Sequence, residues 1–227
     1  MIKITQSTLR KIVCESVRRI LMCESQITTD IDKAYMDAVN RGDMKTAQRM
    51  VQNAAKAAMP NTKVVDENGM PLVMYHGTAK DFYIFGIEHL GETSGNEGWF
   101  GPGFYFTQWK ESARGYAGWA KTQHGGEERI IPCFINIKNP QVVDATQGNF
   151  VLDKNADGVI ATINITKDNP YSRNGQRYSN GELYYEVKAN NSNQIKSADP
   201  VTYDGQGNVI PLSKRFDLNN DDIRYEE

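Results

Sequence analysis

The spacing of apolar residues changes at Pro60, and this change constrains the fold more than any other feature of the sequence. Before Pro60, apolar residues recur every three or four positions, which is the spacing of amphipathic helices. After it, short β-branched and aromatic runs alternate with turns rich in Gly and Asn, as in strands and loops. The sequence therefore predicts an α+β fold, with a helical N-terminal region over residues 1–60 and a mixed β-sheet core over residues 61–227.

Three helices are expected in the N-terminal region. The first begins near Ser7 or Thr8, either of which can cap a helix, and it carries an apolar stripe opposite a basic face. The other two are predicted over 30–41 and 43–59, as a helical hairpin broken at Gly42. A basic face opposite an apolar stripe is usually a solvated face, so nucleic-acid contact is the minority interpretation.

Beyond Pro60 the sequence predicts a β-hairpin with Asn68-Gly69 in its turn, and its second strand runs directly into His76. Residues 85–100 and 165–181 are rich in Gly, Asn and other polar residues and are expected to be loops. Further strands are predicted at 104–106, 130–137, 157–160 and 183–188, with a helix at 111–121 and a last hairpin around Gly205-Gln206-Gly207.

Composition narrows the function classes. The chain has 227 residues and a net charge of −2, so no global field marks it as a nucleic-acid or membrane-surface binder. The three cysteines show no metal-ligand spacing, and no apolar run is long enough to cross a membrane. These features predict a cytoplasmic protein, although delivery into a host cell by a dedicated machine would leave no mark in the sequence. The oligomeric state stays open.

Chemically capable side chains follow one another through the predicted core. One strand ends in Tyr75-His76-Gly77-Thr78, and the turn Gly101-Pro102-Gly103 opens the next. The remaining candidates come at the ends and centres of predicted elements: Tyr105 after that turn, Ser112 and Tyr116 on the following helix, and Glu186 in the strand at 183–188. Each residue alone is more often structural than functional, but their joint order favours one shared explanation.

These residue types suit the binding and cleavage of NAD. The bond between nicotinamide and ribose breaks through a transition state with positive charge on the ribose. A glycine backbone can bind the carboxamide, tyrosine rings can stack on the nicotinamide, and an imidazole can bind a ribose hydroxyl. A glutamate can bind the other ribose, stabilise the developing charge and polarise the attacking nucleophile.

The motifs resemble those of ADP-ribosyltransferases with a His-Tyr-Glu triad, the class of diphtheria toxin and the poly(ADP-ribose) polymerases. Those polymerases carry Trp-His-Gly-Ser and Phe-Gly-Lys-Gly-Ile-Tyr-Phe, where this chain has Tyr75-His76-Gly77-Thr78 and Phe100-Gly101-Pro102-Gly103-Phe104-Tyr105-Phe106. In that family a serine that contacts the carboxamide precedes a stacking tyrosine on the next helix. Ser112 and Tyr116 match these two residues, but one more residue separates them here than in the family. The tail after Gln194 also resembles a subfamily found in polyvalent proteins of phages and mobile elements. The resemblance covers residues 63–227 and implies a split mixed β-sheet.

The resemblance implies a mono-ADP-ribosyltransferase that uses NAD as a substrate, needs no metal and modifies a protein or nucleic-acid acceptor, as a phage or toxin-type effector. It assigns His76, Tyr105 and Glu186 to catalysis. Gly77, Thr78, Ser112 and Tyr116 are assigned to NAD binding, with His76 on the adenine-side ribose. Glu182 is the rival carboxylate to Glu186. Two alternative functions stay open: an NAD glycohydrolase that depletes NAD, and an inactive relative that binds a nucleotide or a partner.

Overall fold

The computed structural model describes residues 6–90, 98, 100–145, 151–164, 171–173, 176–178 and 183–224. Its first element, α1 (Gln6–Asn40), is one continuous helix. The helix predicted from Ser7 or Thr8 and the helix predicted over 30–41 are therefore one. Thr29 and its neighbours include no Gly or Pro, and a cap signal alone does not interrupt a helix. Helix α2 (Met44–Ala58) follows as predicted, and the Asp43 side chain accepts from Thr46 N at 3.1 Å to cap it.

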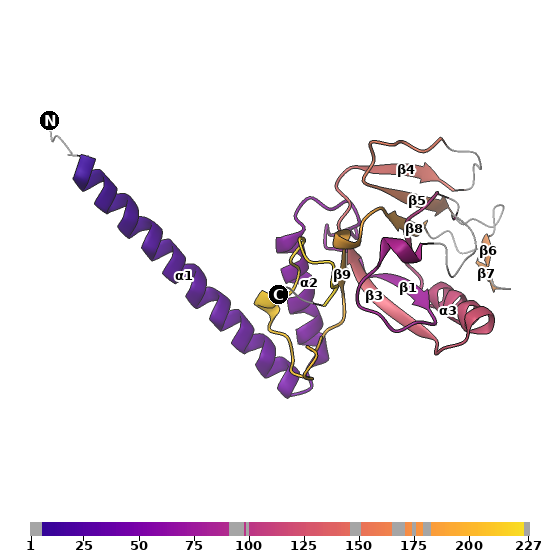
Figure 1. Cartoon of the computed structure of the whole chain (residues 1–227), viewed down its shortest axis with the longest axis horizontal. Coiled ribbons are helices and arrows are strands. Elements are labelled where there is room, and N and C mark those ends of the chain that lie inside the picture. The colour runs from indigo at the N-terminus through magenta and orange to yellow at the C-terminus, as the bar shows by residue number, and fades with distance from the viewer. Residues whose placement is uncertain are drawn as a thin grey trace.

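A seven-stranded mixed sheet forms the core, which confirms the predicted α+β class (Figure 1). Its strand order is β4-β5-β8-β2-β1-β3-β9, and only β4 and β5 run parallel. The strands are β1 (Met74–Thr78), β2 (Phe104–Thr107), β3 (Arg129–Ile135), β4 (Pro140–Asp144), β5 (Gly158–Asn164), β8 (Leu183–Ala189) and β9 (Ile195–Ser197). The remaining elements are α3 (Lys110–His124) and the short 3₁₀ turns η1 (Ile87–His89), η2 (Ser192–Gln194) and η3 (Leu212–Lys214).

Two further segments differ from the sequence prediction. Strand β4 begins at Pro140, where only a turn was expected, because proline is tolerated as the first residue of a strand. The loop predicted at 165–181 includes a separate hairpin of β6 (Tyr171–Arg173) and β7 (Gln176–Tyr178). The residues between these strands are Asn-Gly, a hairpin signal that the polar composition of the segment concealed.

The sheet splits between β1 and β2. These strands pair at one position, Tyr75 with Thr107, whereas β1 pairs with β3 at five positions and β2 pairs with β8 at four. Apart from Tyr75 and Thr107, no residues of β1 and β2 pair with each other in the described part of the chain. The sequence motifs around His76 and Tyr105 therefore lie on the two sides of this split.

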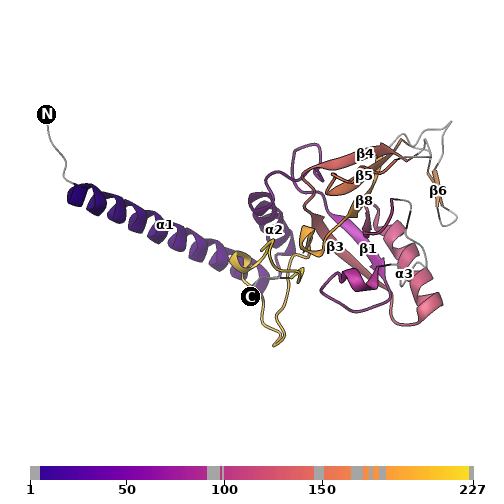
Figure 2. The same cartoon turned by 45° about the horizontal axis from the view of Figure 1, so that its top comes forward.

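The end of the helical region packs onto the sheet through a shared core. Tyr35 and Val51 from the two helices, together with Phe134 of β3 and Phe216 of the C-terminal segment, form one buried cluster. The rest of α1 projects away from the fold (Figures 1 and 2). Among the described residues, no helix has the length and apolar character that a membrane span requires.

Candidate active site

His76 joins the two sides of the split through its side chain. Its Nδ1 lies 2.9 Å from the carbonyl oxygen of Tyr105 on β2. A carbonyl can only accept, so Nδ1 carries the hydrogen and Nε2 is left as an acceptor in the neutral ring. The ring packs edge-on against Phe85 at 5.0 Å between centroids, and burial lowers the pKa of His76. A neutral imidazole is therefore favoured here. The contact with Tyr105 uses Nδ1 and does not involve Nε2.

Gly77 allows α3 to lie directly on β1. A Cβ at this position would come 1.9 Å from the backbone oxygen of Ala113, so no larger residue fits without moving the helix. Ser112 precedes Ala113 in α3 and is buried, whereas Tyr116, one turn later, keeps 41% of its surface exposed. The close contact brings the start of α3 to the strand end that carries Gly77.

Thr78 is buried at the end of β1 and is already used within the chain. Its hydroxyl oxygen accepts from Lys80 N at 3.1 Å, which stabilises the turn that leaves the strand. This contact gives Thr78 a structural role, and its predicted role in NAD binding stays a prediction, because the hydroxyl can still donate its hydrogen.

Tyr105 folds back on the turn that precedes it. Its hydroxyl donates to the Gly101 carbonyl at 2.6 Å and accepts from Phe100 N at 2.9 Å. Its ring lies nearly parallel to that of Phe100, with 6.2 Å between centroids. Burial, with a smaller contribution from the nearby Glu186 carboxylate, raises the pKa of Tyr105 to about 12. The phenol thus stays protonated and holds the turn.

Glu186 lies in β8, directly opposite Thr107 of β2. Opposite residues of antiparallel strands share a face, and so do residues two apart, so Glu186 lies on the same face as Tyr105. Burial raises the pKa of Glu186 to about 7. A carboxyl group that titrates near neutral pH in a partly buried site has the properties of a catalytic acid or base. Glu182, its rival, lies outside the described residues.

The structure brings the predicted residues together around the split but not on one face. Tyr105 and Glu186 share one face of the sheet, and α3 covers β1 on that side. The ring of His76 lies on the other face, against Phe106, as strand alternation requires. It reaches β2 only through the Nδ1 contact with Tyr105. The three neighbouring strands β1, β2 and β8, rather than one sheet face, are the feature that these residues share.

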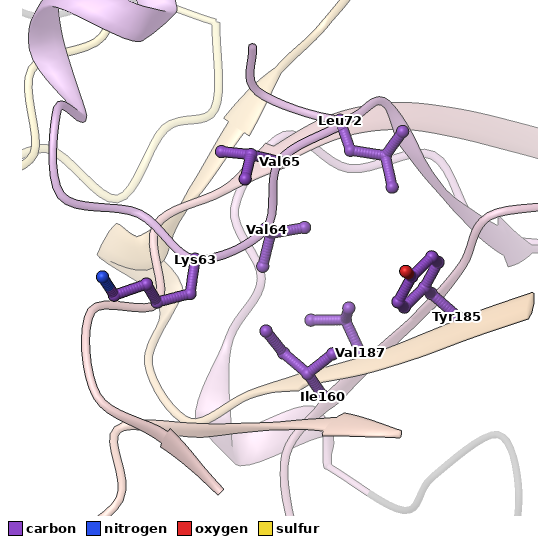
Figure 3. A pocket seen from close by; sticks show the side chains of 7 residues that line it. All are labelled: Lys63, Val64, Val65, Leu72, Ile160, Tyr185 and Val187. Atoms are coloured by element: carbon purple, nitrogen blue, oxygen red, sulfur yellow. The ribbon is translucent and has the colours of Figure 1, made fainter. Parts of the chain in front are cut away.

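A small cavity lies on the face of β8 opposite Glu186, and none of the candidate residues lines it (Figure 3). Its volume is about 20 Å³. Such a volume holds one water molecule and no nucleotide. Its lining comes mostly from the hairpin before β1 and from β5 and β8: Lys63, Val64, Val65, Leu72, Ile160, Tyr185 and Val187.

Lys188 is a residue that the sequence analysis missed. It lies two positions after Glu186 on the same face of β8 and directly opposite Tyr105. Its side chain is buried against Gly103, where a Cβ would come within 2.7 Å of its Cγ and Cδ. Burial lowers the pKa of Lys188. The available signal was the Glu-Val-Lys alternation, which puts a carboxylate and an ammonium on one face of a central strand.

Comparison with known proteins assigns the family. The model of a family described as ADP-ribosyltransferase in polyvalent proteins matches residues 66–205, more than half of the chain. The chain belongs to this family. The match runs from the hairpin before β1 to beyond β9, so it includes every candidate residue and confirms the resemblance seen in the motifs. No curated protein matches the chain.

Membership of an ADP-ribosyltransferase family implies NAD as the substrate. Within the described residues, no group of three or more His, Cys, Asp or Glu side chains could hold a metal ion. The helices α1 and α2 and the segment after residue 205 lie outside the matched range.

Proposed function

We propose that this protein is a mono-ADP-ribosyltransferase, which cleaves NAD and transfers ADP-ribose to a protein or nucleic-acid acceptor. The observation that carries the proposal is the position of Glu186, on the same face as Tyr105 and one strand away from the split that His76 spans. Burial raises the pKa of this carboxyl group to about 7. The effector role in a phage or toxin system is part of the proposal and follows from the resemblance to polyvalent proteins.

The nicotinamide half of NAD would bind where α3 meets β1. The Gly77 backbone and the Ser112 hydroxyl are the donors and acceptors for the carboxamide, and the rings of Tyr105 and Tyr116 are the stacking surfaces. The contact between Gly77 and Ala113 supports this assignment, because it fixes the start of α3 against the strand end. The Nε2 of His76 would accept a hydrogen bond from a hydroxyl of the adenine-side ribose.

The chemical step breaks the bond between the anomeric carbon of the ribose and the nicotinamide nitrogen. The bonding electron pair leaves with the nicotinamide, which becomes neutral, and positive charge develops on the ribose. The ionised Glu186 carboxylate would bind a hydroxyl of that ribose and stabilise the charge. The acceptor nucleophile then attacks the anomeric carbon, and its proton passes to Glu186, which acts as general base.

Labelled NAD separates this proposal from its alternatives. The full chain is incubated with NAD that carries a label in its adenylate half, together with a cell extract. Label retained on protein, RNA or DNA is the expected result. Free ADP-ribose alone would indicate a glycohydrolase, and the absence of any turnover would indicate a relative that only binds; both results would contradict the proposed transfer. Mass spectrometry of the extract then identifies the modified acceptor.

A further inference from the structure

Most of α1 extends beyond the rest of the fold (Figure 1), and large apolar side chains described near its two ends are exposed. Figures 1 and 2 show only its C-terminal end beside α2. The α1 residues that pack in the described core clusters are Tyr35, Met36 and Val39. By contrast, Leu9 and Val13 are each 53% exposed. An amphipathic helix is stabilised mainly by packing its apolar face against another surface.

Between Leu9 and Ile31 the apolar residues of α1 also include Ile12, Cys14, Leu21 and Met22, but the seven that form one stripe are spaced symmetrically about Ile20. They follow steps of 4, 4, 3, 3, 4 and 4 residues, at Leu9, Val13, Val17, Ile20, Cys23, Ile27 and Ile31. At 3.6 residues per turn, this stripe drifts by only about 40° around the helix and runs for about 33 Å. Reversal of the helix about Ile20 leaves the spacing unchanged, so Leu9 of one copy corresponds to Ile31 of another.

Charge selects the antiparallel arrangement over the parallel one. The half of α1 before Ile20 is basic, because Arg10, Lys11, Arg18 and Arg19 outnumber Glu15. The half from Leu21 to Ile31 is acidic, with Glu24 and Asp30 and no basic residue. Parallel helices would place the two basic halves together, whereas antiparallel helices pair each basic half with an acidic one.

The place where α1 meets the fold also fits this arrangement. Asp32, just beyond the stripe, is tied to the C-terminal segment, because it accepts from Ser213 N at 2.8 Å and from Ser213 Oγ at 2.6 Å. An overlap that ends at Ile31 therefore uses the projecting length of the helix and stops where the fold begins. We propose that α1 pairs antiparallel with α1 of a second copy of this chain, which places the two sheets at opposite ends of the helix pair.

The first test measures the mass of the full chain by light scattering after gel filtration. A species of twice the 25.6 kDa chain mass is expected at micromolar concentration. Val13→Asp places a carboxylate in the stripe of both copies and is expected to raise the dissociation constant at least about a hundredfold. Cys14→Asp is the matched control, because its exposed neighbouring position lies off the stripe, and it should leave the mass unchanged.

The second test fixes the direction of pairing. In antiparallel helices Val17 of one copy corresponds to Cys23 of the other, so Val17→Cys in a Cys14→Ser background should form a 17–23 disulfide between copies when oxidant is added. Mass spectrometry identifies the link. A 25.6 kDa species at tens of micromolar, a dimer unaffected by Val13→Asp, or 17–17 and 23–23 links would each overturn the proposal. Far-UV circular dichroism checks that each variant keeps its fold.

Discussion

Two regions of the molecule bury ionisable groups in different ways. One is the split between β1 and β2, and the other is the junction where β9 and the residues after it meet the C-terminal segment, residues 212–224. At the junction, Lys196 is fully buried, and its ammonium donates to the Asn220 and Asp222 carbonyls. Arg215 is also buried there and donates to the Ser197 and Asp199 carbonyls at 3.1 and 2.9 Å. Both cations are held by backbone acceptors that tie distant parts of the chain together, which is a structural use of charge.

At the split, burial perturbs groups that are suited to chemistry. Burial raises the pKa of Glu186 to about 7 and lowers the pKa values of His76 and Lys188. Burial also lowers the pKa values of Lys196 and Arg215 at the junction, so a shifted pKa does not by itself separate the two regions. At the split, the raised pKa of Glu186 favours proton transfer near neutral pH and costs stability. The comparison teaches that burial alone does not identify a catalytic residue, because the bonds that accompany it decide between holding the fold and doing chemistry.

The largest effect is expected at Glu186. Glu186→Gln keeps the size of the side chain but removes its negative charge and its basicity, so transfer should fall by about a thousandfold while NAD affinity stays close to that of the parent. Initial rates with labelled NAD and binding by calorimetry measure the two quantities. Glu67→Gln, in the exposed turn before β1, is the control and should keep full activity. A fully active Glu186→Gln variant would direct attention to Glu182.

The two buried lysines test the comparison directly. Lys196→Met leaves the Asn220 and Asp222 carbonyls without their donor, so the free energy of unfolding should fall by about 2 kcal/mol. Lys188→Met removes a buried ammonium at the split and should preserve stability while it lowers the transfer rate. Urea denaturation and initial rates are measured on both variants. Equal losses of stability would remove the distinction drawn between the two regions.

The pH dependence of activity and of stability should run in opposite directions. In the proposed mechanism catalysis needs the Glu186 carboxylate, so transfer should rise with pH and reach half of its maximum near pH 7. The folded pKa lies above the ordinary value of 4.5, so the folded state holds its proton longer than the unfolded state. Stability should therefore fall as pH rises from about 4.5 to about 7, by about 3 kcal/mol relative to Glu186→Gln. Urea denaturation at several pH values measures the free energy of unfolding of the parent and of Glu186→Gln. The same pH dependence in both proteins would contradict this prediction.

The smallest effect is expected on the exposed face of α3. Tyr116→Ala should weaken NAD binding by about 1 kcal/mol through the loss of stacking, with little change in stability because the ring is 41% exposed. Trp119→Ala is matched to it, since Trp119 lies on the same helix and is 44% exposed, and it should leave NAD affinity unchanged. If both variants bind NAD equally well, Tyr116 does not belong to the site.

The sequence predicted much of the core because local signals agree there. The strands at β2, β3 and β8 have apolar runs bounded by Gly, Pro or Asn, and the family match agrees with the motif order. It failed where a signal was weak or ambiguous, as at Thr29 inside α1 and at Pro140 in β4. Periodicity also missed Lys188, because a lysine in a strand usually lies on a solvated face and only the neighbouring strands and the 101–103 turn bury it.

By itself, the sequence determined the type of fold, the order of the motifs and the symmetric apolar stripe of α1, because spacing and turn residues are local properties. Only the tertiary structure decided that His76 and Glu186 approach the split from opposite faces and that the His76 ring keeps Nε2 as an acceptor. It also decided which buried charges hold the fold. These properties depend on strand register and burial, and both arise from contacts between residues that lie far apart in the chain.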